Sequence, residues 1–359
     1  MTASPRTIAG VEELAAVLGA SWPAISRARE VTAQRRGLLL ELVDELLTSD
    51  TSFVVGGSFG RDEVTSGSDL DWTLLIDGQA NPDHIDTANE IRRRIEEGGF
   101  KKPGAEGGFG GIVFSHDLIH NIGGDQDDNA NTTRRLLLLL ESQPIGRRDA
   151  FDRTVRNVLR RYIVEDFGWM HARNSRNLPR FLHNDFVRYW RTMAVDFAYK
   201  RKMRDGHGWA LRTAKLRMSR KLIYVSGVLM CYACAIDPDI SALKPTPDRP
   251  DSALPIVDFL ASFVDQTPLT IVARTLGAYP EFDESLRSLF LRYDEFIGVL
   301  DDEEKRTGLD KLERDAVAED PVYNDVRAAS EDFQSSLLSM FFDITSTPIS
   351  SLTRTYGVF

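Results

Sequence analysis

The hydrophobic positions in the first part of the chain alternate between helical and strand spacing. Val11 to Leu18 and Ile25 to Leu47 carry leucine and valine at helical intervals. Thr51 to Val55 and Leu70 to Ile76 are short runs that end at Gly-Gly and Asp-Gly turn signals, which predicts two strands. The chain therefore opens with helices and continues into a sheet.

Three further segments extend this first unit. Asp83 to Glu97 predicts a helix that ends at Gly98-Gly99. Gly110 to His120 predicts a third strand, and Asn131 to Ser142 another helix.

The remainder of the chain has mainly helical spacing. Residues 151–235 and 256–343 predict helices, and the prolines of 238–255 predict a loop between them. We therefore predict an α+β protein in which a small α/β domain precedes a larger all-helical one. The predicted boundaries are N-terminal helices at 1–50, the α/β domain at 51–147, a basic helical domain at 148–237, the Pro-rich loop at 238–255 and a C-terminal helical region at 256–359.

Composition narrows the class of protein. A length of 359 residues favours two domains, and 42% hydrophobic with 27% charged residues is typical of a globular protein. We expect no membrane span, because no apolar run approaches the ~18–20 residues needed. The N-terminus lacks a signal-peptide layout, so a cytoplasmic location is expected, and two cysteines exclude a disulfide scaffold.

Charge is unevenly distributed. The net charge is −10, yet residues 151–225 hold 18 Lys and Arg against 6 Asp and Glu, a local charge of +12. The rest, with 26 basic and 48 acidic residues, carries −22. The basic segment predicts a place for polyanions.

One motif indicates chemistry: FVVGGS at 53–58, followed after ten residues by DLDW at 69–72. Gly56 and Gly57 end a strand and let the backbone approach a phosphate, while the Ser58 hydroxyl can bind phosphate oxygens. Asp69 and Asp71 project to one side of a strand, and two adjacent carboxylates favour Mg²⁺ together with substrate phosphates. Either half alone is often an ordinary turn or surface charge.

The combined motif resembles the DNA polymerase β-like nucleotidyltransferase superfamily. GGSFGRDEVTSGSDLDWTLLID is most similar to the branch that resembles PII uridylyltransferase, in which Gly60-Arg61 and Ser68-Asp69 also have counterparts. The resemblance covers residues 53–77 specifically and extends loosely to about 146. It implies a mixed sheet flanked by helices, with N-terminal helices packed on this catalytic domain.

The same resemblance implies roles for individual residues. Gly57 and Ser58 would bind the NTP triphosphate, and Asp69 and Asp71 would hold Mg²⁺, with Mn²⁺ as an alternative. Family members add a third acidic residue from a later strand, for which Asp117 is our candidate. The fallback candidates are Glu141, Asp125, Asp127 and Asp128.

A second phosphate-binding element is predicted in the basic segment. Arg212, Lys215 and Ser219 fall on one stripe of a helix over 209–221. Lys215 and Ser219 resemble the Lys and Ser that related polymerases use for the β- and γ-phosphates, although a solvated basic helix face is the alternative. The runs 188–191 and 200–202 mix aromatic and basic residues, which suits RNA or a helix core.

Other reactive residues are given structural interpretations. Cys231 and Cys234 lie in an apolar run and are expected to be buried thiols. His116 and His120 would lie ~13 Å apart on a strand and thus not form a metal pair. His171, His183 and His207 are scattered.

Our leading hypothesis is a Mg²⁺-dependent nucleotidyltransferase that moves an NMP from an NTP to an acceptor hydroxyl and releases pyrophosphate. The resemblance favours a protein side chain as the acceptor, while the basic segment would equally serve a second nucleotide or RNA. The alternatives are a catalytically degenerate nucleotide-binding regulatory module and an RNA-binding protein without nucleotide chemistry.

Overall fold

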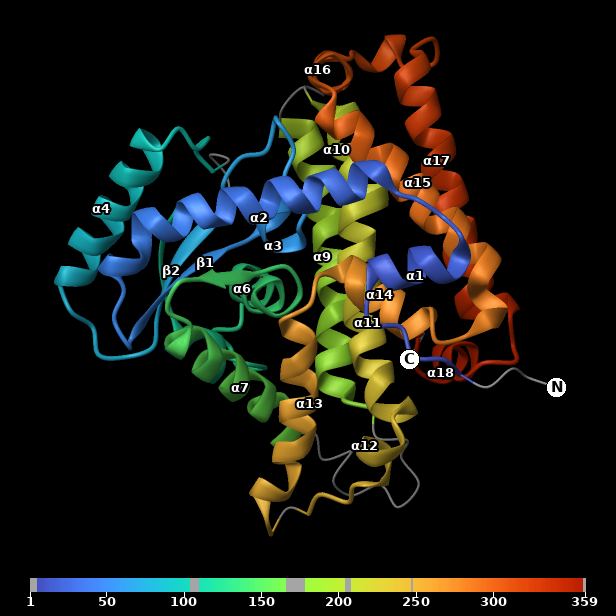
Figure 1. The fold of residues 1–359 in the computed structure, drawn as a ribbon. Coiled ribbons are helices and arrows are strands. Elements are labelled where there is room, and N and C mark those ends of the chain that lie inside the picture. The colour runs from blue at the N-terminus through green and yellow to red at the C-terminus, as the bar shows by residue number, and fades with distance from the viewer. Residues whose placement is uncertain (1–4, 104–109, 166–177, 204–207, 247, 358–359) are drawn as a thin grey trace.

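A four-stranded mixed sheet organises the N-terminal part of the chain (Figure 1). The computed structural model describes residues 5–103, 110–165, 178–203, 208–246 and 248–357. The strand order is β3-β2-β1-β4, in which β1 is antiparallel to β2 and β4, and β2 is parallel to β3. The bounds are β1 (Thr51–Val55), β2 (Trp72–Ile76), β3 (Gly111–Phe114) and β4 (Gln143–Ile145).

Alternation along the strands separates two hydrophobic cores. Phe53 and Val55 of β1 face the core formed with α2 (Pro23–Val43) and α4 (Asp83–Glu97). Val54 faces the opposite core, which is continuous with the helical region. The central strands are therefore buried on both faces. The other helices of this part are α1 (Val11–Leu18), α3 (Gly57–Arg61), α5 (Ser115–His120) and α6 (Asn129–Leu140).

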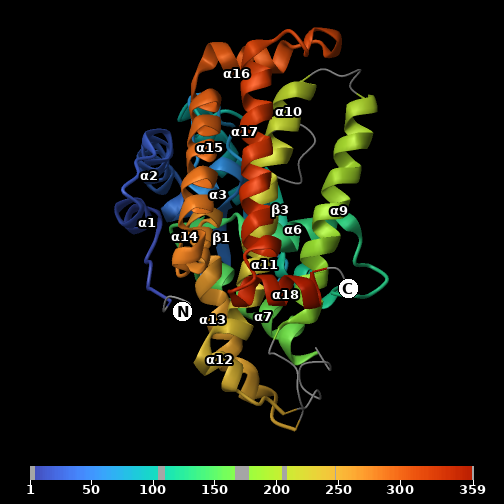
Figure 2. The ribbon, with the colours of Figure 1, turned by 90° about the vertical axis from the view of Figure 1, so that its right-hand side faces the viewer.

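The larger part of the chain is helical. Helix α15 packs on α17, and the mostly buried α11 packs on α9 and α14 (Figure 2). Its helices are α7 (Asp149–Val164), α9 (Arg180–Met203), α10 (Trp209–Lys215), α11 (Lys221–Ile236), α12 (Pro238–Ala242), α13 (Leu254–Val264), α14 (Pro268–Leu276), α15 (Asp283–Asp301), α16 (Glu303–Lys311), α17 (Pro321–Leu338) and α18 (Pro348–Tyr356), with π-helical turns at Leu216–Arg220 and Ser339–Asp343. The predicted α+β class, with a small mixed sheet before a helical region, is confirmed.

Helix α2 connects the two parts. It crosses from the sheet to the helical region in Figure 1, contacting α4 and β4 as well as α15. Helix α1 instead packs on α14. The N-terminal helices thus link the sheet to the C-terminal helices.

One helical segment has the length and composition of a membrane span. Trp209–Ile236 meets that criterion, but 72% of its most apolar window is buried inside the protein. The bent pair Pro250–Val264 and Pro268–Leu276 meets it only if counted together. Burial of this kind is what a core helix requires, so the finding is weak support for a span.

Two sequence predictions are wrong in part. The predicted strand over 110–120 ends at Phe114, and α5 follows, so His116 and His120 lie one turn apart with ring centroids separated by 4.7 Å. A short apolar run does not separate a strand from a following short helix. The Pro-rich segment 238–255 contains α12 and the start of α13, because proline is well accommodated in the first turn of a helix.

Most arginines of α7 do not face a ligand site. Arg153 pairs with Asp77, Arg156 with Asp258 and Arg160 with Asp251. These three arginines of the +12 segment therefore neutralise acidic residues elsewhere in the fold. The side chains of 200–202, and His171 and His207, lie outside the described residues.

The buried His183 makes stability depend on pH. It is 3% exposed between α9 and α11, stacks on Tyr232, and burial lowers its pKa to about 4. In the unfolded chain this histidine has a pKa near 6.5. The stability that the neutral, buried His183 contributes is therefore complete above pH 6.5 and is lost as the pH falls toward 4.

We expect the free energy of unfolding of the wild type to fall by about 2 kcal/mol more than that of His183→Gln between pH 7 and pH 5. Urea unfolding at both pH values measures this difference. The same substitution at the exposed His120 is the control. Parallel loss of stability in wild type and His183→Gln would contradict the prediction.

Candidate functional site

A polar cavity of about 220 Å³ lies where the ends of β1 and β2 meet the helical region. It is lined by residues predicted from two separate parts of the sequence, namely Gly57, Ser58, Asp69, Asp71, Lys215 and Ser219. More than 140 positions separate Asp71 from Lys215 in the chain. Tertiary folding therefore brings the two predicted elements into one site.

The register of the sheet sets the geometry of the first element. Val55 pairs with Trp72, so the turn after β1 lies against the residues before β2, and Gly56 N–H donates to the Asp71 carbonyl at 2.8 Å. Gly57 has φ +58°, and a Cβ there would lie 2.6 Å from Asp71 Oδ2. Glycine is thus required both by the left-handed backbone and by the contact with this carboxylate.

The two aspartates form a half-buried region of negative charge. Burial, followed by the charges of Asp69 and Glu141, raises the pKa of Asp71 to about 7, which Arg61 and Lys215 oppose. Bringing carboxylates together in this way costs free energy unless a cation neutralises them.

Arg61 of α3 joins the cavity to its surroundings. Its Nε donates to Glu63 at 2.8 Å, and its Nη1 pairs with Glu141. Glu63 also accepts a 2.6 Å hydrogen bond from the hydroxyl of Tyr293 in α15. This buried network connects the sheet domain to the helical region on one side of the site.

The second element lies on an irregular turn. Lys215 ends α10, and the π-helical turn Leu216–Arg220 follows before α11 begins. Lys215, Ser219 and Arg220 line the cavity, but Arg212 does not. A π-turn is wider than an α-turn, so it shifts Ser219 and Arg220 relative to regular helical spacing, whereas Arg212 lies in the regular helix α10 before the turn.

The cavity also collects cations. Burial, then the nearby charge of Arg306, lowers the pKa of Lys215 to about 8, and Arg61 and Arg220 act in the same direction. A Cβ on Gly67 would lie 1.0 Å from Arg306 Nη1, so Arg306 of α16 extends across that glycine. Within the described residues, no carboxylate forms an ion pair with Lys215, Arg220 or Arg306. Such a cluster favours an anionic ligand.

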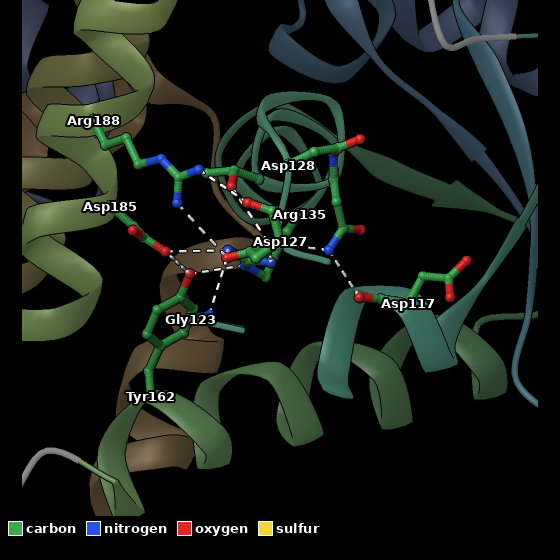
Figure 3. Close-up of polar contacts among 10 residues, drawn as sticks. Asp117, Gly123, Asp127, Asp128, Arg135, Tyr162, Asp185 and Arg188 are labelled. Carbon is green, nitrogen blue, oxygen red and sulfur yellow. Dashed lines mark hydrogen bonds and ion pairs between the residues drawn. The ribbon is translucent and has the colours of Figure 1, made fainter. Parts of the chain in front are cut away.

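The candidate third carboxylate, Asp117, lies elsewhere. It is in α5, and its side chain is 65% exposed beside His116. In Figure 3 its carboxylate points away from the group formed by Asp127, Arg135 and Asp185. It does not line the cavity. The sequence prediction depended on a strand at this position, whereas the chain has already turned into a helix.

Of the other acidic candidates, one lines the cavity. Asp127 binds Arg135 through both oxygens at 2.8 and 2.9 Å, and Asp128 caps α6 by accepting from the Asn131 N–H (Figure 3). Asp125 is exposed and does not line the cavity. Glu141, which directly follows α6, is 8% exposed and does line it.

The described residues contain no group of three or more His, Cys, Asp or Glu arranged to hold a metal ion by themselves. The described strand β3, Gly111–Phe114, carries no acidic side chain. The sequence-predicted metal ligands Asp69 and Asp71 both line the cavity. Two carboxylates suit Mg²⁺, because it commonly takes its remaining ligands from water and substrate phosphates.

Sequence reasoning missed two cations of the site. Arg306 follows an acidic stretch, and Arg220 was not distinguished from its basic neighbours. No local pattern identifies either residue. The buried Cys231 and Cys234 agree with the prediction made for them.

Comparison of the chain with protein-family models, with curated proteins and with solved structures finds no match. The arrangement of the site therefore carries the functional argument.

Gly57→Ala tests the contact with Asp71. We expect the free energy of unfolding to fall by about 2 kcal/mol, because alanine must adopt a left-handed backbone against a carboxylate. Thermal and urea unfolding measure this change. Gly111→Ala is the control, since a Cβ there meets nothing within 4 Å. Equal stability of the two variants would contradict the geometry.

Proposed function

We propose that the protein is a Mg²⁺-dependent nucleotidyltransferase that moves an NMP from an NTP to an acceptor hydroxyl and releases pyrophosphate. The observation that carries the proposal is the convergence of the Gly57-Ser58 turn, the Asp69 and Asp71 carboxylates and Lys215 with Ser219 around one cavity. A phosphate-binding turn and a carboxylate pair are the components that metal-assisted phosphoryl transfer needs.

The residues of the cavity would bind the triphosphate from two sides, the sheet and the helical region. Gly57 lets the Asp71 carboxylate lie against the turn that lines the cavity, and Ser58 offers a hydroxyl there. Lys215 and Ser219 approach from the helical side and, with Arg306, would hold the outer phosphates. Charge-assisted hydrogen bonds of this kind fix the α-phosphorus in position for attack.

Asp69 and Asp71 would hold Mg²⁺, or Mn²⁺ in its place. Burial, and after it the charges of Asp69 and Glu141, raises the pKa of Asp71, and a bound cation would offset both effects. When bound, the ion neutralises charge on the attacking and leaving oxygens.

Glu141 is our proposed third carboxylate. One of its oxygens accepts from Arg61, and its Oε1 has no hydrogen-bond or ion-pair partner among the described residues. In the proposed step the acceptor oxygen bonds to the α-phosphorus as the bond to the bridging oxygen breaks. The hydroxyl proton passes to Glu141 Oε1, and pyrophosphate leaves with the electron pair.

A second candidate function is a regulatory module that binds a nucleotide without turnover. It is favoured by one observation: Glu141 is engaged by Arg61, and the described β3 supplies no acid in its place. Binding would then persist while transfer is absent.

The double substitution Asp69→Asn and Asp71→Asn separates these functions. For an enzyme, we expect Mg²⁺-dependent pyrophosphate release to fall on the order of 1,000-fold while stability is unchanged or raised, because a repulsion between two half-buried carboxylates is removed. Pyrophosphate release with each NTP, together with unfolding curves, tests this. Asp117→Asn, outside the cavity, should retain activity. NTP binding without release in the wild type would favour the regulatory module.

Glu141→Gln tests the third carboxylate. Glutamine retains an oxygen to accept from Arg61 but cannot take a proton, so we expect the rate of transfer to fall ~100-fold or more with NTP affinity unchanged. Single-turnover rates and calorimetry measure the two effects separately. A variant with wild-type rate would exclude Glu141 from the step.

A further inference from the structure

A second and larger cavity adjoins the proposed catalytic site. Its volume is about 1050 Å³, and it lies between one face of the sheet, α6 and α9. Val54, Thr73 and Val113 form its sheet side. Leu137, Glu141 and Arg220 line both cavities, so the two meet at Glu141.

The larger cavity has an apolar interior and a charged rim, where Arg134 and Arg191 outnumber Asp196. Leu75, Leu138 and Tyr189 are buried residues of its lining. Arg134 and Arg191, by contrast, are exposed and mark its opening to solvent. A ligand would therefore place its apolar or planar part inside and a charged group at the rim.

The arginines of this cavity differ from those of α7. Arg134, Arg191 and Arg220 form no ion pair with any described residue, whereas Arg156 and Arg160 each have an aspartate partner. Arginine has a planar fork that binds phosphate through two hydrogen bonds. Three arginines without carboxylate partners around one cavity indicate an anionic ligand.

The aromatic lining adds a preference for a planar group. Tyr189 is 3% exposed within the cavity, while Tyr199 is 63% exposed in its lining. Stacking on aromatic side chains is a general way of binding nucleobases. The volume is at the upper end of the range for small-molecule sites.

We propose that this cavity binds the acceptor, and that the acceptor is a nucleotide rather than a protein side chain. The inference rests on the proposed function. The base would lie against Tyr189, the phosphate would bind Arg134 and Arg191 at the rim, and a ribose hydroxyl would reach Glu141. Because Glu141 is buried, a hydroxyl on a folded protein surface would not reach it without inserting a segment into the cavity.

The product follows from the chemistry of the step. The ribose oxygen of the acceptor bonds to the α-phosphorus, pyrophosphate leaves, and the proton passes to Glu141. The two nucleotides become joined by a phosphodiester, with no oxidant or reductant required.

Calorimetry on the full chain separates the two cavities. First, an α,β-methylene triphosphate of each base is titrated with Mg²⁺, which tests the proposed function alone. Then AMP, GMP, CMP and UMP are titrated into protein saturated with the analogue that binds. We expect a second equivalent of at least one mononucleotide to bind, with affinity at least ten-fold weaker in Arg134→Ala/Arg191→Ala.

The control is Arg156→Ala/Arg160→Ala, which removes the same charge from α7. It should bind both ligands as the wild type does, and the rim variant should bind the triphosphate analogue within about three-fold of wild type. Absence of analogue binding would refute the proposed function itself. Normal analogue binding without a second equivalent, or displacement of the analogue by the mononucleotide, would overturn only the acceptor inference.

The product analysis gives an independent result. With α-³²P-labelled NTPs and the mononucleotide that binds, we expect label in a dinucleotide-sized product that is sensitive to a phosphodiesterase. Label attached instead to protein would overturn the inference while leaving nucleotidyl transfer established.

Discussion

The antiparallel register of β1 and β2 is the constraint on which the site depends. It places the turn after one strand against the carboxylates before the other, and it is held by the hydrogen bond from Gly56 to the Asp71 carbonyl. The close approach of Gly57 to Asp71 follows directly from it. A slip of one residue would reverse the faces of the strand and separate the turn from the acids.

The helical region supplies the positively charged side of the site. The π-turn after Lys215 and the helix that carries Arg306 bring cations to the cavity without local carboxylate partners. The sheet side supplies carboxylates that disfavour one another. An NTP with its divalent cation would satisfy both sets of charges at once. The cation would neutralise the carboxylates of the sheet side, and the phosphates would neutralise the cations of the helical side.

Sequence reasoning succeeded where local pattern determines structure. The helix over 83–97 and the strand over 51–55 have the predicted bounds, and the Gly-Gly-Ser and Asp-x-Asp motifs meet in space. It failed where tertiary packing decides. Asp117 belongs to a helix, Arg212 does not line the cavity, and Arg306 reaches the site only through the fold. The basic segment was predicted to bind polyanions, yet Arg153 and Arg156 of α7 form ion pairs with aspartates of the protein.

The central claim is that two carboxylates and a nucleotide together make one metal site. Mn²⁺ binding followed by electron paramagnetic resonance, with and without an α,β-methylene NTP, tests it most directly. The account predicts weak Mn²⁺ binding to the protein alone, tightening at least ten-fold with the nucleotide, and loss of that tightening in Asp69→Asn. Mn²⁺ binding that is indifferent to the nucleotide or to Asp69 would contradict it.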